Sequence, residues 1–223
     1  MPELKACLFD LDGVIVDTAR FHYIAWRQLA NDLGFDLSVH DNEQLKGVSR
    51  MESLEIILKL GGVQISEEEK LQRAAVKNAR YLELCKQMTP ADTLPGVRAF
   101  LDELKRASIL IGLGSASKNA RIILERIDIL SYFDTQVDGN RITKGKPDPQ
   151  VFEMGAADLG VSASQCVVFE DAVAGIQSAK AAKMFAVGIG DPQILVEADL
   201  VVPGFSDFSL TRLKETFENR NIE

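Results

Sequence analysis

The sequence contains few cysteines, and their number is odd. Three cysteines are scattered through 223 residues, so neither a disulfide framework nor a cysteine-based zinc site is expected. A reducing cytoplasm is therefore the expected location. The longest apolar runs, such as residues 109–113, are far too short to span a bilayer. Residues 1–5 also lack the apolar region and cleavage site of a secretory signal, and no membrane partner is expected.

Positive charge is also scarce. Lys and Arg number 25 against 33 Asp and Glu, which gives a net charge of −8 at pH 7. No block of basic residues interrupts this balance, so nucleic acid is not an expected partner. An anionic small substrate would need a local cluster of cations to overcome the overall negative field. The sequence shows no internal repeat that would form an interface, and we expect a monomer.

The chain does contain an alternation of strand-like and helix-like segments. Short apolar runs predict strands at residues 6–9, 109–114, 166–169, 185–189 and 200–202. Helical patterns are found at residues 97–107, 118–127, 149–160, 172–183 and 209–220. Strands joined by helical crossovers imply a parallel sheet with helices on both faces. The predicted fold class is therefore α/β, with a doubly wound, Rossmann-like core.

Between about residues 18 and 88 the sequence carries only helical signals. They predict a helix with the apolar face Trp26, Leu29, Ala30 and Leu33, a second helix at residues 51–60, and a third from Ser66 toward Lys86. This block follows the first strand and precedes all the others. We therefore predict a core formed by residues 1–15 and 89–223, with an inserted all-helical cap domain at residues 16–88.

Polar side chains follow the predicted strands of the core. Asp10 and Asp12 come after the first strand, Ser115 after the second, and Glu170 and Asp171 after the third. Ligands of open α/β sheets bind beyond the carboxyl ends of the strands. Each signal also has an ordinary explanation, because Asp and Gly are common in turns, serines cap helices, and acids suit a helix N-terminus.

Lys146 is the remaining candidate in the core. Pro147 and Pro149 stiffen its loop and hold the lysine just ahead of a helix. Taken alone, Lys146 reads as a solvated lysine in a turn. Successive segments of the core thus carry an acid pair, a hydroxyl, a lysine and a second acid pair.

This order of residues resembles the haloacid dehalogenase superfamily of phosphotransferases. Phe9 to Thr18 resembles the first motif of the superfamily, Ser115 the second, Lys146 the third and Glu170-Asp171 the fourth. The helical block resembles the cap of the subgroup whose insertion follows the first motif. The dehalogenase branch lacks the second acid, whereas Asp12 is present here, so dehalogenation is disfavoured.

The resemblance implies a mechanism. Asp10 would attack phosphorus and carry an aspartyl phosphate, while Asp12 would act as general acid and then as general base. The resemblance also implies Mg²⁺, held by the Asp10 carboxylate, the Asp12 backbone carbonyl, Glu170 and Asp171, which would relieve the repulsion between nucleophile and phosphate. Ser115 and Lys146 would bind the oxygens of the transferring phosphoryl group.

Residues 42–50 and three other stretches resemble the β-phosphoglucomutase family within this superfamily. The other stretches are residues 22–26, Lys77-Asn78 and residues 115–119. The resemblance implies that substrate is bound by His22, Trp26, Lys46, Gly47, Val48, Ser49, Arg50, Lys77, Ser115, Ala116, Ser117, Lys118, Asn119 and Lys146. On spacing alone, His22 would be a packed core residue, and Lys77 and Arg50 would be surface cations. Arg50 is also suited to bidentate binding of a second phosphate.

The expected activity is interconversion of β-D-glucose 1-phosphate and glucose 6-phosphate. The resemblance implies an aspartyl phosphate and β-glucose 1,6-bisphosphate as the priming intermediate, and two phosphate sites suit a bisphosphate that turns end for end. A sugar-phosphate phosphatase of the same fold is the first alternative. The second is an inactive binding module, against which the intact Asp10, Asp12, Lys146 and Asp171 speak. The role of Arg141 stays open.

Overall fold

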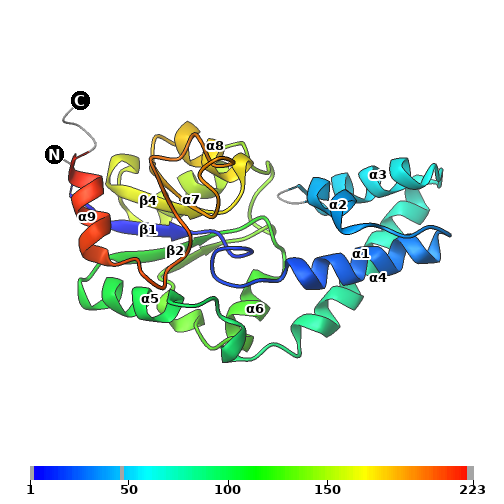
Figure 1. Ribbon diagram of the computed structural model, residues 1–223, viewed down its shortest axis with the longest axis horizontal. Coiled ribbons are helices and arrows are strands. Elements are labelled where there is room, and N and C mark those ends of the chain that lie inside the picture. The colour runs from blue at the N-terminus through cyan, green and yellow to red at the C-terminus, as the bar shows by residue number, and fades with distance from the viewer. Residues whose placement is uncertain (1–2, 46–47, 220–223) are drawn as a thin grey trace. The chain divides into compact units, whose positions relative to one another are not determined.

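The computed structural model of the chain describes residues 3–45 and 48–219, which fall into two compact units (Figure 1). The core unit combines Met1–Asp17 with Thr89–Glu223, and the cap unit is Thr18–Met88. The cap unit thus begins two residues after the residue 16 expected from the sequence, and the chain re-enters the core at the expected residue 89.

The core unit is built on a parallel sheet. Its strands are β1 (Ala6–Phe9), β2 (Leu110–Gly114), β3 (Thr135–Val137), β4 (Cys166–Glu170), β5 (Phe185–Ile189) and β6 (Leu200–Val202). The order across the sheet is β3-β2-β1-β4-β5-β6, and all pairs are parallel. The order reverses beside β1, the doubly wound arrangement that places a ligand crevice at this point. The predicted α/β fold class is confirmed.

Helices cover both faces of this sheet (Figure 1). The core helices are α5 (Val97–Arg106), α6 (Ala120–Arg126), α7 (Gln150–Leu159), α8 (Val173–Ala181) and α9 (Leu210–Asn219). Because successive side chains of a strand point to opposite faces, Leu8 and Phe9 of β1 serve two different layers. All four residues of β1 are buried, as expected for a central strand with helices on both sides.

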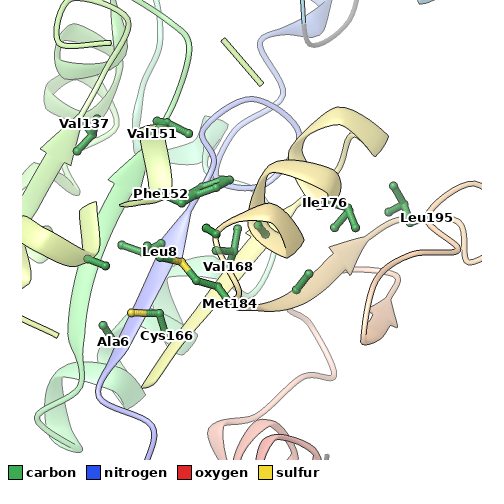
Figure 2. Packing of buried hydrophobic residues seen from close by; sticks show 14 residues of the cluster. Ala6, Leu8, Val137, Val151, Phe152, Cys166, Val168, Ile176, Met184 and Leu195 are labelled. Atoms are coloured by element: carbon green, nitrogen blue, oxygen red, sulfur yellow. The ribbon is translucent and has the colours of Figure 1, made fainter. Parts of the chain in front are cut away.

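The two faces of the sheet have different packing. Leu8 and Val168 pack with Phe152 of α7 and Ile176 of α8 in a mainly aliphatic cluster (Figure 2). On the opposite face Phe9 stacks on Phe169 with ring centroids 4.7 Å apart. Further rings surround this pair, from Phe100, Phe133, Phe205 and Phe208. These layers fix β1 and β4 rigidly, and with them the residues that follow each strand.

One strand is absent from the sequence-based prediction. β3 has only three residues and lies at the edge of the sheet, and Thr135 and Gln136 are partly exposed. A short polar edge strand has no apolar run to announce it. The other five strands lie within a residue of their expected positions.

Every secondary-structure element in the described part of the cap unit is a helix. Its helices are α1 (Ala19–Asp32), α2 (Val39–Asn42), α3 (Arg50–Gly61) and α4 (Glu67–Cys85). Their apolar faces share one small core that includes Trp26, Leu29, Leu54 and Ile57. The Ser66 hydroxyl accepts the Glu69 N–H, which caps α4 as the sequence predicts. No helix in the described part of the chain is long and apolar enough to cross a membrane.

Candidate active site

Three buried polar residues mark one edge of the core sheet. Asp10 follows β1, Ser115 follows β2, and Glu170 ends β4. Phe9 is in register with Leu113 and with Phe169, so the three side chains belong to the same carboxyl edge. The exposed fractions of Asp10, Ser115 and Glu170 are 7%, 1% and 1%. Two buried carboxylates this close to an apolar layer are costly unless a cation neutralises them.

Lys146 is that cation. Its Nζ donates to Asp10 Oδ1 at 2.5 Å and also to Glu170 Oε1, and only 5% of its side chain is exposed. Burial alone would lower the pKa of Lys146, but Asp10 and Glu170 outweigh burial and raise it above its usual range. The structure therefore brings Lys146, the third motif, into contact with Asp10 of the first motif and Glu170 of the fourth.

The carboxylates remain crowded despite this lysine. Burial raises the pKa of Asp10 to about 6, with Lys146 opposing and Glu170 adding to the rise. Burial also raises the pKa of Asp171 to about 8, and the neighbouring Glu170, Asp10 and Asp12 contribute. One ammonium thus leaves an excess of negative charge at this edge of the sheet.

The donor set suits a hard divalent cation. Asp10, Glu170 and Asp171 each offer a carboxylate oxygen, and these oxygens lie within 4.8 Å of one another. Mg²⁺ prefers oxygen ligands and is commonly held by few carboxylates. Gly13 makes room for this arrangement, because it has φ +83° and a Cβ built there would lie 2.0 Å from Asp171 Oδ2. The residues present therefore fit the expected Mg²⁺, and the Asp12 carbonyl as a further ligand stays a prediction.

Gly175 is a site residue that the sequence reading missed. It lies in α8, and a Cβ at this position would come within 1.9 Å of the Glu170 carboxylate. The Glu170 side chain therefore occupies the space above this glycine, and its Oε2 accepts the Ala172 N–H at 2.9 Å. A glycine inside a predicted helix, a few residues after an acid pair, is a signal of close approach that could have identified it.

The predicted phosphate loop, residues 115–119, follows β2 directly. Ser115 Oγ accepts the Ser117 N–H at 3.1 Å, and Ser117 Oγ accepts the Asn119 N–H at 3.2 Å. Ala116 and Lys118 are exposed, whereas Ser115 is buried. The helix that follows begins at Ala120, with Asn119 as its N-cap residue. The loop thus arranges short side chains and backbone N–H groups before a helix, as anion-binding loops do.

The predicted cap residues His22, Trp26 and Lys77 lie together. Lys77 Nζ is 2.8 Å from His22 Nδ1 and 4.2 Å from the centroid of the Trp26 ring. Because an ammonium only donates, His22 Nδ1 accepts, and the imidazole is neutral with its proton on Nε2. Burial lowers the pKa of His22 well below its usual value, and Lys77 and Arg50 lower it further. Lys77 is only 2% exposed, so the solvated surface lysine is excluded.

Arg50 is held by the residue after Lys77. Its Nη2 donates to Asn78 Oδ1 at 2.7 Å, and the guanidinium is half-buried, which lowers its pKa. Ser49 caps α3, since its Oγ accepts the Glu52 N–H and its own N–H reaches the Glu52 carboxylate. Val48 is exposed, whereas the predicted binding residues Lys46 and Gly47 lie outside the described residues.

Arg141, which the sequence left without a role, links the turn after β3 to α7. Its guanidinium forms a two-pronged ion pair with Asp158 of α7, at 2.6 Å and 3.1 Å, and donates to the Gln136 carbonyl at 2.8 Å. The loop that carries Lys146 is fixed similarly. Gln150 Oε1 accepts the N–H groups of residues 143 and 144, and the buried Ser178 donates to the Asp148 carbonyl. None of these contacts was foreseen, because each joins segments that no local pattern relates.

Comparisons with known proteins agree with this geometry. Residues 4–183 match the family model of the haloacid dehalogenase-like hydrolases. A β-phosphoglucomutase of Bacillus subtilis is 46% identical over 98% of both chains. A phosphorylated carbohydrates phosphatase of Thermotoga maritima is 30% identical, over 95% of this chain and 99% of that protein.

Among solved structures, a β-phosphoglucomutase from Clostridium difficile superposes with a TM-score of 0.94. It is 42% identical, and the match covers 99% of this chain and 100% of that one. The resemblance therefore extends over both units and over the strand-end residues described above. The chain belongs to the haloacid dehalogenase-like hydrolase family.

Proposed function

We propose that this chain is a phosphomutase that interconverts β-D-glucose 1-phosphate and glucose 6-phosphate, through an aspartyl phosphate and β-glucose 1,6-bisphosphate. Full-length similarity to β-phosphoglucomutases supports this proposal. The observation that favours a mutase over a phosphatase is a second cationic cluster. In the cap, Lys77 is buried and Arg50 is half-buried, while Lys146 is buried in the core. A bisphosphate needs cations at both ends, whereas hydrolysis of a monophosphate needs one set.

In the first half-reaction a carboxylate oxygen of Asp10 forms a bond to phosphorus as the bond from phosphorus to the sugar oxygen breaks. Asp12 gives its proton to the departing sugar oxygen. In the second half-reaction Asp12 takes a proton from the acceptor hydroxyl, which attacks the aspartyl phosphate and frees Asp10. A pKa of about 6 leaves Asp10 mostly ionised at neutral pH, as a nucleophile requires.

We propose that Mg²⁺ is held by the carboxylates of Asp10, Glu170 and Asp171 and by the Asp12 backbone carbonyl. When bound, Mg²⁺ offsets the repulsion between the carboxylate nucleophile and the phosphate. Lys146 and the Ser115 hydroxyl donate hydrogen bonds to oxygens of the transferring group. In the core, residues 117–119 bind the phosphate at the other end of the sugar. In the cap, Arg50 is the proposed ligand of a substrate phosphate.

The proposed activity is tested by following two products of one reaction. β-D-Glucose 1-phosphate is supplied with Mg²⁺ and a trace of glucose 1,6-bisphosphate, and α-glucose 1-phosphate serves as the control substrate. Glucose 6-phosphate formed from the β anomer alone, with little free phosphate, is the expected result. Free phosphate without isomerised sugar would instead identify a sugar-phosphate phosphatase.

Replacing Arg50 with Ala is expected to raise the KM for β-glucose 1-phosphate by about 10- to 100-fold, the range expected when a charge-assisted hydrogen bond to phosphate is lost. Phosphoenzyme formation from acetyl phosphate should change little, because that donor has no second phosphate. Arg73→Ala is the matched control, since Arg73 also lies in the cap and pairs with Glu69 on the surface. Unchanged steady-state kinetics in Arg50→Ala would remove the argument for two phosphate sites.

Mg²⁺ is expected to raise the melting temperature more at pH 8.5 than at pH 6. The pKa of Asp171 is about 8 in the fold, whereas an unperturbed aspartate carboxyl has a pKa of 3.8. Stability that is present below pH 3.8 is therefore lost as pH rises toward 8, because the unfolded chain ionises this carboxyl while the fold still holds its proton. Bound Mg²⁺ reverses that loss, and near saturation it should add on the order of 5–10 °C.

Differential scanning fluorimetry with MgCl₂ or EDTA at both pH values measures this effect. In Asp171→Asn the shift at pH 8.5 should be largely abolished. An equal shift at both pH values, retained in that variant, would place the Mg²⁺ elsewhere.

We further propose that the protein acts as a cytoplasmic monomer on a small sugar phosphate. All three cysteines are buried and lie outside any disulfide, a state that fits a reducing compartment. Size-exclusion chromatography with light scattering tests the monomer directly.

A further inference from the structure

The loop 115–119 is supported from behind by the turn that follows β3. Gly139 N–H donates to the Ser117 carbonyl at 3.2 Å, and Asn140 Nδ2 donates to the Lys118 carbonyl at 3.0 Å. Two consecutive carbonyls of the loop are therefore bound by two consecutive residues of the turn. This support comes from a segment about 20 residues further along the chain.

The turn itself is fixed on both sides. The Asp138 carboxylate accepts the Asn140 N–H at 2.9 Å and one Nδ2 proton at 3.1 Å, which orients the side-chain amide. Arg141, the next residue, is bound to Asp158 of α7. Asn140 thus presents a preset donor to the Lys118 carbonyl from a turn that is anchored to a core helix.

These contacts determine which way the loop faces. In a planar trans peptide the carbonyl and the following N–H point in opposite directions. Because the carbonyls of Ser117 and Lys118 point to the turn, the N–H groups of Lys118 and Asn119 point away from it, and the Asn119 N–H donates to Ser117 Oγ at 3.2 Å. The loop therefore turns these two carbonyls toward the turn and the Lys118 N–H toward the opposite side, which is the polarity that an anion requires.

The contact between the turn and loop 115–119 also requires a residue without a side chain at position 139. A Cβ at this position would lie 2.2 Å from the Ala116 carbonyl oxygen. That oxygen belongs to the backbone and cannot rotate away, so any side chain at residue 139 must displace the loop.

We propose that Asn140 and Gly139 are positioning residues for the substrate phosphate that is not being transferred. They act by holding loop 115–119 with the Lys118 N–H toward that phosphate, and neither has to touch the substrate. The inference rests on the proposed function, which places this phosphate at residues 117–119. It also gives a physical reason for Gly139 and Asn140, which belong to none of the four motifs described above.

The test compares Asn140→Asp, Asn140→Ala and Gly139→Ala with the wild-type enzyme. Aspartate keeps the shape of asparagine, but its carboxylate cannot donate to the Lys118 carbonyl and repels it. We expect the KM for β-glucose 1-phosphate to rise about five- to tenfold in both Asn140 variants and at least as much in Gly139→Ala. The kcat should stay within about threefold, because Asp10 and Asp12 lie on a different loop.

Arg121→Ala is the matched control, because Arg121 lies in α6 just after the loop and forms an exposed pair with Glu125. Asn140 is exposed, so its variants should melt near the wild-type temperature even if Gly139→Ala fails to fold. An unchanged KM in both Asn140 variants overturns the inference, as does a fall in kcat with KM unchanged. If the wild-type enzyme releases free phosphate instead, the mutase proposal fails, and the same KM comparison on hydrolysis still decides the role of Asn140.

Discussion

Asp10→Asn is expected to abolish turnover, with a fall in kcat of at least about 10⁴-fold, the scale of loss when a covalent nucleophile is removed. Asparagine keeps the shape of the side chain and can still accept a hydrogen bond from Lys146, which lies 2.5 Å from Asp10 Oδ1. An amide oxygen, however, is too weak a nucleophile to attack phosphorus. The variant should therefore form no acid-stable, hydroxylamine-labile phosphoenzyme from labelled acetyl phosphate.

The same variant should be at least as stable as the wild-type protein in the absence of Mg²⁺. The pKa of Asp10 is raised to about 6 by burial, so its ionised form opposes folding at pH 7, and the neutral amide removes that cost. Thermal melting in EDTA at pH 7 measures this. Loss of activity with an unchanged or higher melting temperature would separate a missing nucleophile from a damaged fold.

Two control variants make the result specific. Asp207→Asn, in an exposed loop before α9, should leave turnover unchanged. Asp12→Asn should lose turnover on the sugar phosphate but still be labelled by acetyl phosphate, because an acyl phosphate has a leaving group that needs no proton. A labelled phosphoenzyme in Asp10→Asn would show that another residue is the nucleophile.

Lys146→Met is expected to destabilise the core by about 3–5 kcal/mol at pH 8, the usual cost of removing one partner from a buried ion pair. Asp10 and Glu170 would then face each other with no ammonium between them. Since Lys146 normally lowers the pKa of Asp10, its loss raises that pKa further. When the pKa of a carboxyl is raised in the fold, the protein loses stability as pH rises through that pKa. The destabilisation of Lys146→Met should therefore be smaller at pH 5 than at pH 8.

Urea unfolding at pH 5 and pH 8, followed by circular dichroism, measures this difference. Tryptophan fluorescence would be the wrong probe, because Trp26 is the single tryptophan and lies in the cap. The kcat of Lys146→Met should also fall by about 10²- to 10³-fold, since a donor to the transferring group is lost.

Lys144→Met is the matched control for this experiment. Lys144 lies two residues away with 69% of its side chain exposed, and its pair with Asp148 is a surface contact. Such a pair contributes about 0–1 kcal/mol, so neither stability nor turnover should change much. If Lys146→Met were as stable as the wild-type protein at pH 8, the lysine would not be the group that neutralises the two buried carboxylates.

Much of the fold was predictable from local pattern. The buried strands at residues 6–9 and 185–189 are continuous apolar runs, so their burial can be predicted from the sequence. β3 was missed because a three-residue edge strand with two half-exposed residues carries no such signal. The helical insertion was equally predictable, because its helices carry apolar residues at helical spacing and begin at capping residues such as Ser66.

The site was predictable in its members but not in its contacts. Asp10, Ser115 and Asp171 follow strands and Glu170 ends one. Parallel strands bring their carboxyl ends to one edge, so the proximity of these residues follows from the fold class. Gly175 was missed because its function is to leave space for a side chain five positions earlier. That requirement exists only once the helix is folded onto the strand end.

The sequence by itself determined the parallel sheet, the inserted cap and the acids at the strand ends, because burial and backbone conformation are recorded locally in each segment. Only the tertiary structure decided which groups neutralise one another. Lys146 meets Asp10 across 136 positions of chain, and Lys77 meets His22 across 55. Asn140 likewise reaches the Lys118 carbonyl from another loop. Charge, protonation and donor direction depend on distances of a few ångströms between such distant segments, and no local pattern carries that information.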